Sequence, residues 1–197
     1  ARPEEIRSLF RNATLIGRRF RLAHIRFGKK VIEVSTFRAG DNDQGGLITH
    51  DNEWGSEEED VLRRDFTING LFYDPETEEI IDYVGGYPDL EKKILRSIGQ
   101  PEKRFIQDPV RMIRLVKFCA RFHFEVEPAT FEALLACRQE IVKSSPARIF
   151  EELLRMLESG ASCPFFHLLN TYGLLRPLSP ILSRFLERKP EENPVFE

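Results

Sequence analysis

Residues 108–121 place four basic side chains at the spacing of a single helix face. At about 100° per residue they fall within about one third of the circumference, and they are Arg111, Arg114, Lys117 and Arg121. A solvated helix face usually carries both signs of charge, because opposite charges four residues apart stabilise the helix. A face of cations alone requires an anion nearby, and the planar fork of arginine suits phosphate oxygens. From the pattern alone, the alternative is an amphipathic helix with a solvated basic face.

The stretch "VLRRDFTING" joins two arginines and an aspartate to an apolar run. In one interpretation, Asp65 caps a helix that runs through Leu71, and Arg63 and Arg64 are solvated. In the other, an arginine binds phosphate and Asp65 accepts a hydrogen bond from a ribose hydroxyl. Asn69, four residues further on, would then share a helix face with Asp65. The stretch alone leaves both interpretations open.

A second basic stretch, "GRRFRLAHIRFGKK", interleaves its cations with aromatic side chains. It fits either a charged edge strand that prevents aggregation or a surface that contacts RNA. The RNA-contact candidates are Arg18, Arg19, Arg21, Lys29 and Lys30. Glu33 lies in the middle of the next predicted strand, where a carboxylate is usually solvent-facing. It becomes a metal-site candidate only if other carboxylates lie beside it.

The bulk properties limit the class of protein. A chain of 197 residues that is 41% hydrophobic and 31% charged can bury a core in one domain or two small ones. The net charge of −3 gives no global attraction for nucleic acid, so any attraction must come from local clusters. The three cysteines form no C-x-x-C pair and the four histidines have no metal-ligand spacing, which indicates reduced core thiols in a cytoplasmic protein. No apolar run reaches the length of a membrane span, and no signal peptide opens the sequence.

The predicted elements change in type near residue 104. Before it, a helix over "ARPEEIRSLF" is followed by strand patterns in "RFRLAHIRF", "KVIEVSTF", "EIIDYV" and "KILRSI". Gly28, Lys29 and Lys30 join the first two strands in a hairpin, "GGYPDLEK" separates the last two, and the loop over 40–55 interrupts the series. The acidic run at 57–60 predicts a solvated helix start.

Helical patterns dominate the rest of the chain. The helix patterns are "DPVRMIRLVKFCARF", "PATFEALLACRQEI", "SPARIFEELLRMLESG" and "CPFFHLLNTYGLL", followed by a polar tail. Asp108 is expected as the N-cap of the first, with Pro109 at its first helical position. Ser145 and Gly160 are expected to bound the third. The sequence therefore predicts an α+β protein, with a sheet region followed by helices.

Four stretches in this order resemble successive motifs of the class II nucleotidyltransferases. They are "RRDFTING", "DYVGGYPDLEKKILRSIG", "DPVRMIRLVKFCARF" and "PARIFEELLRMLESG". This family contains the bacterial poly(A) polymerases and the CCA-adding tRNA nucleotidyltransferases, within the DNA polymerase beta superfamily. The resemblance covers nearly the whole chain. It implies an incomplete polymerase-beta-like palm domain over 1–104, a helical neck for nucleotide recognition over 105–160, and the start of a helical, RNA-binding body over 161–197.

The resemblance also implies a reaction and a set of site residues. The reaction is the Mg²⁺-dependent transfer of a nucleoside monophosphate from a triphosphate to an RNA 3′ hydroxyl, with two metal ions activating the hydroxyl and stabilising pyrophosphate. Asp65 matches an aspartate that contacts ribose or belongs to the active-site acids. In the family's D-x-x-R-x-x-R motif, the arginines bind triphosphate and base. The implied catalytic residues are Asp65 and Glu33, and the implied nucleotide-binding residues are Arg63, Arg64, Asn69, Asp108, Arg111, Arg114 and Arg148.

One feature of the family pattern is missing. The family opens with a Gly-Gly turn, an Arg-Asp pair and a D-x-D strand whose carboxylates bind the metal ions. The segment "ARPEEIRSLF" resembles the helix just after that strand, and no D-x-D precedes it. We therefore expect the principal Mg²⁺ ligands to lie outside these residues, assign no metal ligand within them, and expect the chain alone to be inactive.

The branch of the family follows from the base-reading motif. CCA-adding enzymes carry Glu-Asp-x-x-Arg after the arginine helix, and its Asp and Arg read the edges of C and A. The matching stretch, "PATFE", lacks both. We therefore expect a poly(A) polymerase that adds AMP from ATP to RNA 3′ ends in mRNA processing, with ATP and an RNA 3′ end as partners. The alternatives are a CCA-adding enzyme and a non-catalytic RNA-binding fragment.

Overall fold

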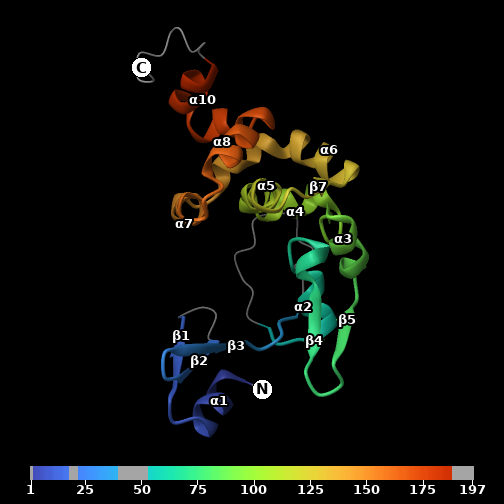
Figure 1. The fold of residues 1–197 in the computed structure, drawn as a ribbon, viewed down its shortest axis with the longest axis vertical. Helices are drawn as coiled ribbons and strands as arrows, with labels where there is room; N and C mark the ends of the chain where they lie inside the picture. The colour runs from blue at the N-terminus through green and yellow to red at the C-terminus, as the bar shows by residue number, and fades with distance from the viewer. Residues whose placement is uncertain (1, 18–21, 40–52, 188–197) are drawn as a thin grey trace. The chain divides into compact units, whose positions relative to one another are not determined.

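The computed structural model describes residues 2–17, 22–39 and 53–187 (Figure 1). The described residues form two compact units, one ending at Arg63 and the other beginning at Arg64. Three of the RNA-contact candidates, most of the predicted loop over 40–55 and most of the polar tail lie outside the described residues. The three candidates are Arg18, Arg19 and Arg21. Within the described ranges, no helix is long and apolar enough to cross a membrane.

The first unit is a small antiparallel sheet with two helices. Its elements are α1 (Pro3–Leu9), β1 (Ala13–Ile16), β2 (Leu22–Phe27), β3 (Lys30–Val34) and α2 (Glu57–Leu62), and the strand order is β1-β2-β3. The predicted hairpin is confirmed: Phe27 pairs with Lys30, and Gly28 takes a φ of 60° in the turn. The predicted acidic helix start is also confirmed, because Ser56 caps α2 with its hydroxyl.

The second unit contains the remaining elements. They are η1 (Thr67–Asn69), β4 (Leu71–Asp74), β5 (Glu79–Asp82), α3 (Gly86–Lys92), β6 (Ile94–Leu95), α4 (Pro101–Gln107), α5 (Val110–Phe122), β7 (Glu125–Val126), α6 (Pro128–Cys137), η2 (Arg138–Lys143), α7 (Pro146–Glu158), α8 (Ser162–Thr171), α9 (Leu175–Leu178) and α10 (Pro180–Glu187). The strands form an antiparallel β4-β5 pair and a short parallel β6-β7 pair. The predicted α+β class is confirmed.

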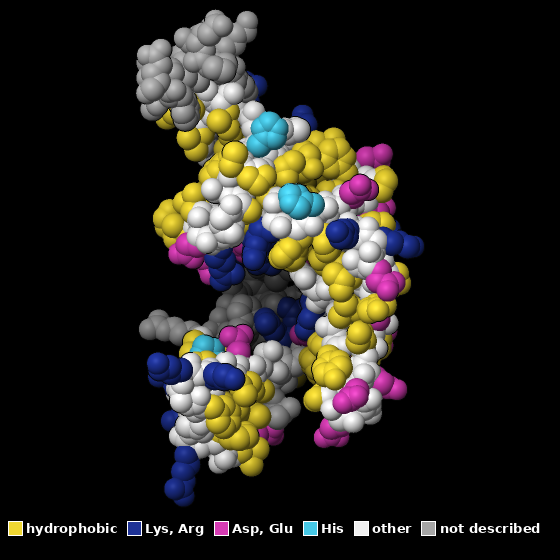
Figure 2. Space-filling view, viewed as in Figure 1, with side chains coloured by type: hydrophobic (Ala, Val, Ile, Leu, Met, Phe, Trp, Pro, Cys, Tyr) yellow, Lys and Arg dark blue, Asp and Glu magenta, His cyan; other side chains and the backbone are white. Residues whose placement is uncertain are grey.

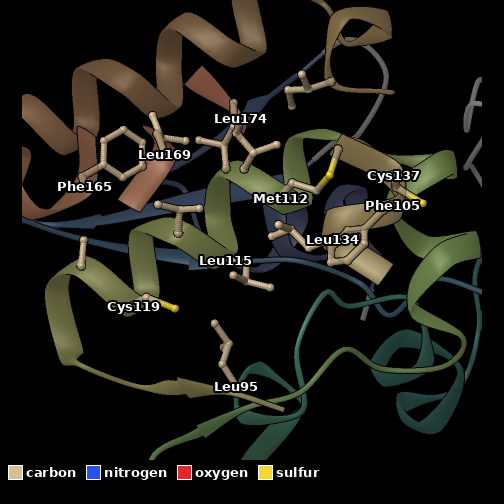
Figure 3. Close-up of a cluster of buried hydrophobic side chains, with 14 of the residues drawn as sticks. Leu95, Phe105, Met112, Leu115, Cys119, Leu134, Cys137, Phe165, Leu169 and Leu174 are labelled. Carbon is tan, nitrogen blue, oxygen red and sulfur yellow. The ribbon is translucent and has the colours of Figure 1, made fainter. Parts of the chain in front are cut away.

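Helix α5 occupies the centre of the core of this unit. It packs against α4, α7, α8 and β6, and its apolar side chains meet those of α4, α6 and α8 (Figure 3). The predicted apolar side of α5 is confirmed, since Met112, Ile113, Val116, Cys119 and Ala120 are all buried. Burial of this side fixes the helix, and with it the direction of its basic side.

The cysteines follow the prediction in part. All three are free thiols, and Cys119 and Cys137 are buried as expected. Burial raises the pKa of the Cys119 thiol to about 11. Cys163 is exposed at the start of α8, so its interpretation as a core thiol is wrong.

The elements around "RRDFTING" differ from the prediction. Thr67–Asn69 form a single 3₁₀ turn whose N-cap is Phe66, and β4 begins at Leu71. Asp65 therefore caps no helix through Leu71. A tertiary contact stabilises this turn: the Thr67 hydroxyl donates to the buried carboxylate of Asp89 at 2.8 Å.

Two further helix predictions need correction. Most of the stretch "GGYPDLEK" forms helix α3 and does not act as a simple connection between strands. Helix α4 was not predicted, and it ends at Gln107, so Asp108 is the C-cap of α4 and not the N-cap of α5. The N-cap of α5 is Pro109, without a side-chain hydrogen bond. The Asp108 carboxylate is engaged by Arg148 from α7.

A close backbone approach holds α3 against the turn of "RRDFTING". The Asp82 carboxylate accepts hydrogen bonds from the backbone N–H groups of Val84, Gly86 and Tyr87. Burial raises the pKa of Asp82, but these N–H groups outweigh it and lower the pKa below its ordinary value. A Cβ atom on Gly86 would lie 2.1 Å from the Thr67 carbonyl oxygen. This position therefore requires glycine for α3 to contact η1.

A partly buried polar network joins this region to α6. Asp89 accepts from Arg96 Nε at 3.0 Å, and Arg96 Nη1 lies 3.5 Å from Glu127. The carboxylate of Glu127 accepts from the backbone N–H of Thr130 at 2.8 Å, at the first turn of α6. Asp89 of α3 is thereby tied, through Arg96, to the N-terminus of α6.

Substitution of Gly86 and of its neighbour Gly85 should distinguish the cost of a packing clash from the cost of an unfavourable backbone conformation. Gly86→Ala should lower the free energy of unfolding by about 3 kcal/mol, because the Thr67 backbone must move. Gly85→Ala should cost only about 1 kcal/mol, since Gly85 has a φ of 73° but open space around it. Urea unfolding midpoints measure both, and equal losses would contradict the packing argument.

Candidate functional site

Arg114 lies at the centre of a cluster of charges within the second unit. Its Nη1 atom is 3.3 Å from Asp65 Oδ2, and its Nε atom donates to Glu152 Oε1 at 3.0 Å. Burial lowers the pKa of Arg114, but the charges of Asp65 and Glu152 and the hydrogen bond to Glu152 outweigh burial and raise it. One guanidinium group thus connects the "RRDFTING" turn, α5 and α7.

Asp65 is held by its own turn as well as by Arg114. Its Oδ1 atom accepts from the Phe66 backbone N–H at 3.0 Å and from Asn69 Nδ2 at 2.9 Å. The structure therefore brings Asp65 and Asn69 together through a 3₁₀ turn, although the sequence pattern suggested a shared helix face. The Asp65 side chain is only 10% exposed, so its orientation is well defined by these partners.

Arg64 supports the same turn from the other side. Its Nη1 atom donates to the Asn69 carbonyl oxygen at 2.6 Å, and its guanidinium lies 4.7 Å from the centre of the Phe72 ring. An arginine over an aromatic face gains a cation–π attraction. The Arg64 carbonyl oxygen accepts from the buried side chain of Arg104 at 2.7 Å. The contacts described for Arg64 therefore stabilise the turn that carries Asp65.

Asp108 joins two further arginines of the predicted site, Arg111 and Arg148. Its Oδ2 atom accepts from Arg148 Nη2 at 2.8 Å and lies 3.7 Å from Arg111 Nε. Burial raises the pKa of Asp108, but the hydrogen bond from Arg148 and the charges of Arg148, Arg111 and Arg114 outweigh it, so the pKa is lowered. Arg111 is buried, whereas the Arg148 side chain is 49% exposed. Arg148 therefore presents its cation to solvent at the edge of the cluster.

Glu152 belongs to this cluster, and the sequence analysis missed it. The residue is 4% exposed, and its two carboxylate oxygens accept from Arg114 Nε and Lys117 Nζ. Burial raises the pKa of Glu152, but these two cations outweigh it and lower the pKa. A signal was present in the sequence: a glutamate stands within the helical spacing of Ile149, Leu153 and Met156, where an apolar side chain is expected.

The solvated basic face is therefore the wrong interpretation for most of α5. Arg111 is buried, and Arg114 and Lys117 are partly buried against carboxylates of other elements; Arg121 is exposed, with its guanidinium over the Phe122 ring. Figure 2 shows basic side chains gathered beside acidic ones where α5 and α7 lie. The ion pairs of this cluster join four cations to three carboxylates, so the cluster keeps an excess of positive charge.

The other predicted site residues lie in the first unit. Arg63 is the C-cap of α2. Glu33 is exposed on β3, where its carboxylate is 3.1 Å from His24 Nε2 on the neighbouring strand. Lys29 and Lys30 are exposed at the β2–β3 hairpin. Among the residues that the structure describes, no group of three or more His, Cys, Asp or Glu side chains could hold a metal ion.

The lowered pKa of Asp108 leads to a pH-dependent stability. A carboxylate with a lowered folded-state pKa stabilises the fold above its unfolded pKa, near 3.8, and loses that contribution as pH falls through the folded value. Asp108→Asn should therefore lower the free energy of unfolding by about 2 kcal/mol at pH 7. The difference in free energy of unfolding between Asp108→Asn and the parent protein should disappear as the pH falls below 3.8.

Urea unfolding at a series of pH values measures this difference. Glu151→Gln is the matched control, because the Glu151 side chain is 61% exposed and pairs with the surface residue Arg155. The control should change stability little at any pH. If the difference in stability between Asp108→Asn and the parent stayed constant down to acidic pH, the lowered pKa of Asp108 would be contradicted.

Comparison with known proteins gives the same family over most of the chain. Residues 1–96 match the family model "Poly A polymerase head domain", and residues 123–186 match "Probable RNA and SrmB- binding site of polymerase A". Poly(A) polymerase I of Salmonella typhi is 43% identical over 94% of this chain and 42% of the relative. The CCA-adding enzyme of Lactobacillus helveticus is 36% identical over 79% of this chain and 39% of that protein.

Solved structures show the same fold. The crystal structure of the Bacillus stearothermophilus CCA-adding enzyme in complex with CTP has a TM-score of 0.76 and 30% identity, over 88% of this chain and 42% of that chain. A tRNA-processing enzyme with CTP has a TM-score of 0.73 and 27% identity, over 89% and 46%. The chain thus spans 42% of the length of the Salmonella typhi relative that it matches.

Proposed function

Since the chain belongs to the family of bacterial poly(A) polymerases and CCA-adding tRNA nucleotidyltransferases, we propose that it supplies the nucleotide-binding part of an enzyme that adds AMP from ATP to RNA 3′ ends. The observation that carries this proposal is the Arg114-centred cluster, in which cations from α5 and α7 outnumber the carboxylates that hold them. A nucleoside triphosphate would supply the negative charge that such a cluster attracts.

The proposed roles follow from exposure and hydrogen-bonding capacity. Arg148, which is half exposed, and Arg114, whose side chain is 32% exposed, can each donate further hydrogen bonds to phosphate oxygens. Arg111 is buried behind them and adds charge to the same region. Asp65 and Asn69 are fixed to one another, and a carboxylate can accept additional hydrogen bonds, which suits a ribose hydroxyl. In this proposal Arg64 acts through the turn it supports.

Magnesium does not fit the described residues. Asp65, Asp108 and Glu152 are each paired with arginine or lysine, and the described part of the chain contains no metal-holding group. The proposal therefore assigns this cluster the binding and orientation of the nucleotide, and routes no step through a metal ion. The catalytic role expected for Glu33 stays a prediction, and in the structure its carboxylate pairs with His24.

ATP is proposed over CTP because of the relatives' sequences. The poly(A) polymerase relative from Salmonella typhi matches 94% of the chain at 43% identity, whereas the CCA-adding relative matches 79% at 36%. The stretch that would hold the base-reading Asp and Arg, residues 128–132, forms the start of α6 and lacks both. RNA is the proposed second substrate, contacted by the region 123–186 and by Lys29 and Lys30, within cytoplasmic mRNA processing.

Primer extension with the full-length gene product tests the activity. With an RNA oligonucleotide and ATP alone, we expect a ladder of added A residues. Ordered addition of C, C and A to a tRNA without its 3′ end would favour the CCA-adding alternative. Retention of RNA without any nucleotide addition would favour the non-catalytic alternative.

Removing the exposed cation of the cluster tests the site. Arg148→Met should weaken ATP binding about tenfold, because it removes a charge-assisted hydrogen bond to phosphate. AMP binding should change less, since AMP carries fewer phosphates. Isothermal titration of the chain with ATP and AMP measures both. Arg155→Met, on the same helix but paired with Glu151, is the matched control and should bind ATP as the parent does. Unchanged ATP binding in Arg148→Met would exclude Arg148 from the site.

A further inference from the structure

Glu152 is placed where a carboxylate is costly. It lies on the side of α7 that packs into the protein, its side chain is 6% exposed, and it still carries a lowered pKa. A buried ion pair contributes little net stability compared with apolar side chains of similar size, because both charges lose water. Packing alone therefore gives little reason for a glutamate at this position.

The contacts of Glu152 indicate what it does instead. One carboxylate oxygen holds Arg114 at Nε and the other holds Lys117, one turn further along α5. Asp65 holds the opposite end of the same guanidinium, at Nη1. A planar group that is held at two points by two different elements has a fixed orientation, so its remaining donors are aimed before any ligand arrives.

We infer that Glu152 is a positioning residue for nucleotide binding, which orients Arg114 toward the triphosphate. The inference rests on the proposed function, because it requires the cluster to bind a nucleotide. The positioning role and the charge of Glu152 predict opposite changes in nucleotide affinity when the charge is removed. A carboxylate near a triphosphate repels it, so removal of the Glu152 charge should tighten binding if charge alone mattered. If orientation matters more, removal of that charge should weaken binding.

The sign of the change therefore tests the inference. Glu152→Gln keeps the shape of the side chain and removes its charge. We expect the ATP dissociation constant, measured by isothermal titration of the chain in EDTA, to rise about tenfold. Glu151→Gln, the neighbouring exposed glutamate, should leave it unchanged. Tighter or unchanged binding in a folded Glu152→Gln variant would overturn the inference. A parent chain that binds no ATP would overturn the proposed function itself.

A double-mutant cycle separates positioning from general stability. In an Arg114→Met background, Glu152→Gln should change the ATP dissociation constant by less than about twofold, because its effect acts through Arg114. The melting temperature should still fall, since Glu152 also holds Lys117. Additive losses of ATP affinity would indicate a structural role and overturn the inference. If Glu152→Gln fails to fold, the same ATP dissociation constant can be measured in a Lys117→Met background, where no lysine is left unpaired. The comparison is then between Lys117→Met alone and Lys117→Met with Glu152→Gln.

Discussion

The described site depends on the two ion pairs of Arg114, whose guanidinium is shared by Asp65 and Glu152. Asp65 and Glu152 lie 87 positions apart in the chain, yet both hold this one side chain. Charges that are partly removed from water must be paired, because the cost of an unpaired buried charge is several kcal/mol. Pairing therefore constrains the "RRDFTING" turn, α5 and α7 to one arrangement, and the same arrangement places the other cations nearby.

The hydrophobic core and the charged cluster are two sides of α5. One side is buried among α4, α6 and α8, and the other meets carboxylates from the rest of the unit. Rotation of α5 would expose apolar side chains and separate the ion pairs at the same time. Packing of the apolar side of α5 therefore also fixes the positions of the charged side chains on its other side. Gly86 contributes as well, because the contact of α3 with the Thr67 carbonyl holds the turn that carries Asp65.

The sequence predicted the local parts of this arrangement and missed the tertiary ones. The two sides of α5 followed from helical periodicity, and the β2–β3 hairpin followed from Gly28. Asp108 was assigned as a helix cap because capping is a local rule, but its carboxylate pairs with Arg148, 40 positions away. The 3₁₀ turn at Thr67 depends on Asp89, which no local pattern links to it. Glu152 was missed for the same reason, since its partners lie on another helix.

The internal carboxylates change how the basic side of α5 should be understood. Without them, the cations would repel one another and move freely, and a ligand would have to order each long side chain as it bound, at an entropic cost of about 0.5–1.5 kcal/mol per side chain. With them, most of that ordering is completed during folding, and the cluster still keeps more cations than carboxylates. A protein with a net charge of −3 can therefore present a localised, ordered positive region. Such a region suits a compact polyanion whose phosphates must lie in one orientation, better than it suits a diffuse attraction for nucleic acid.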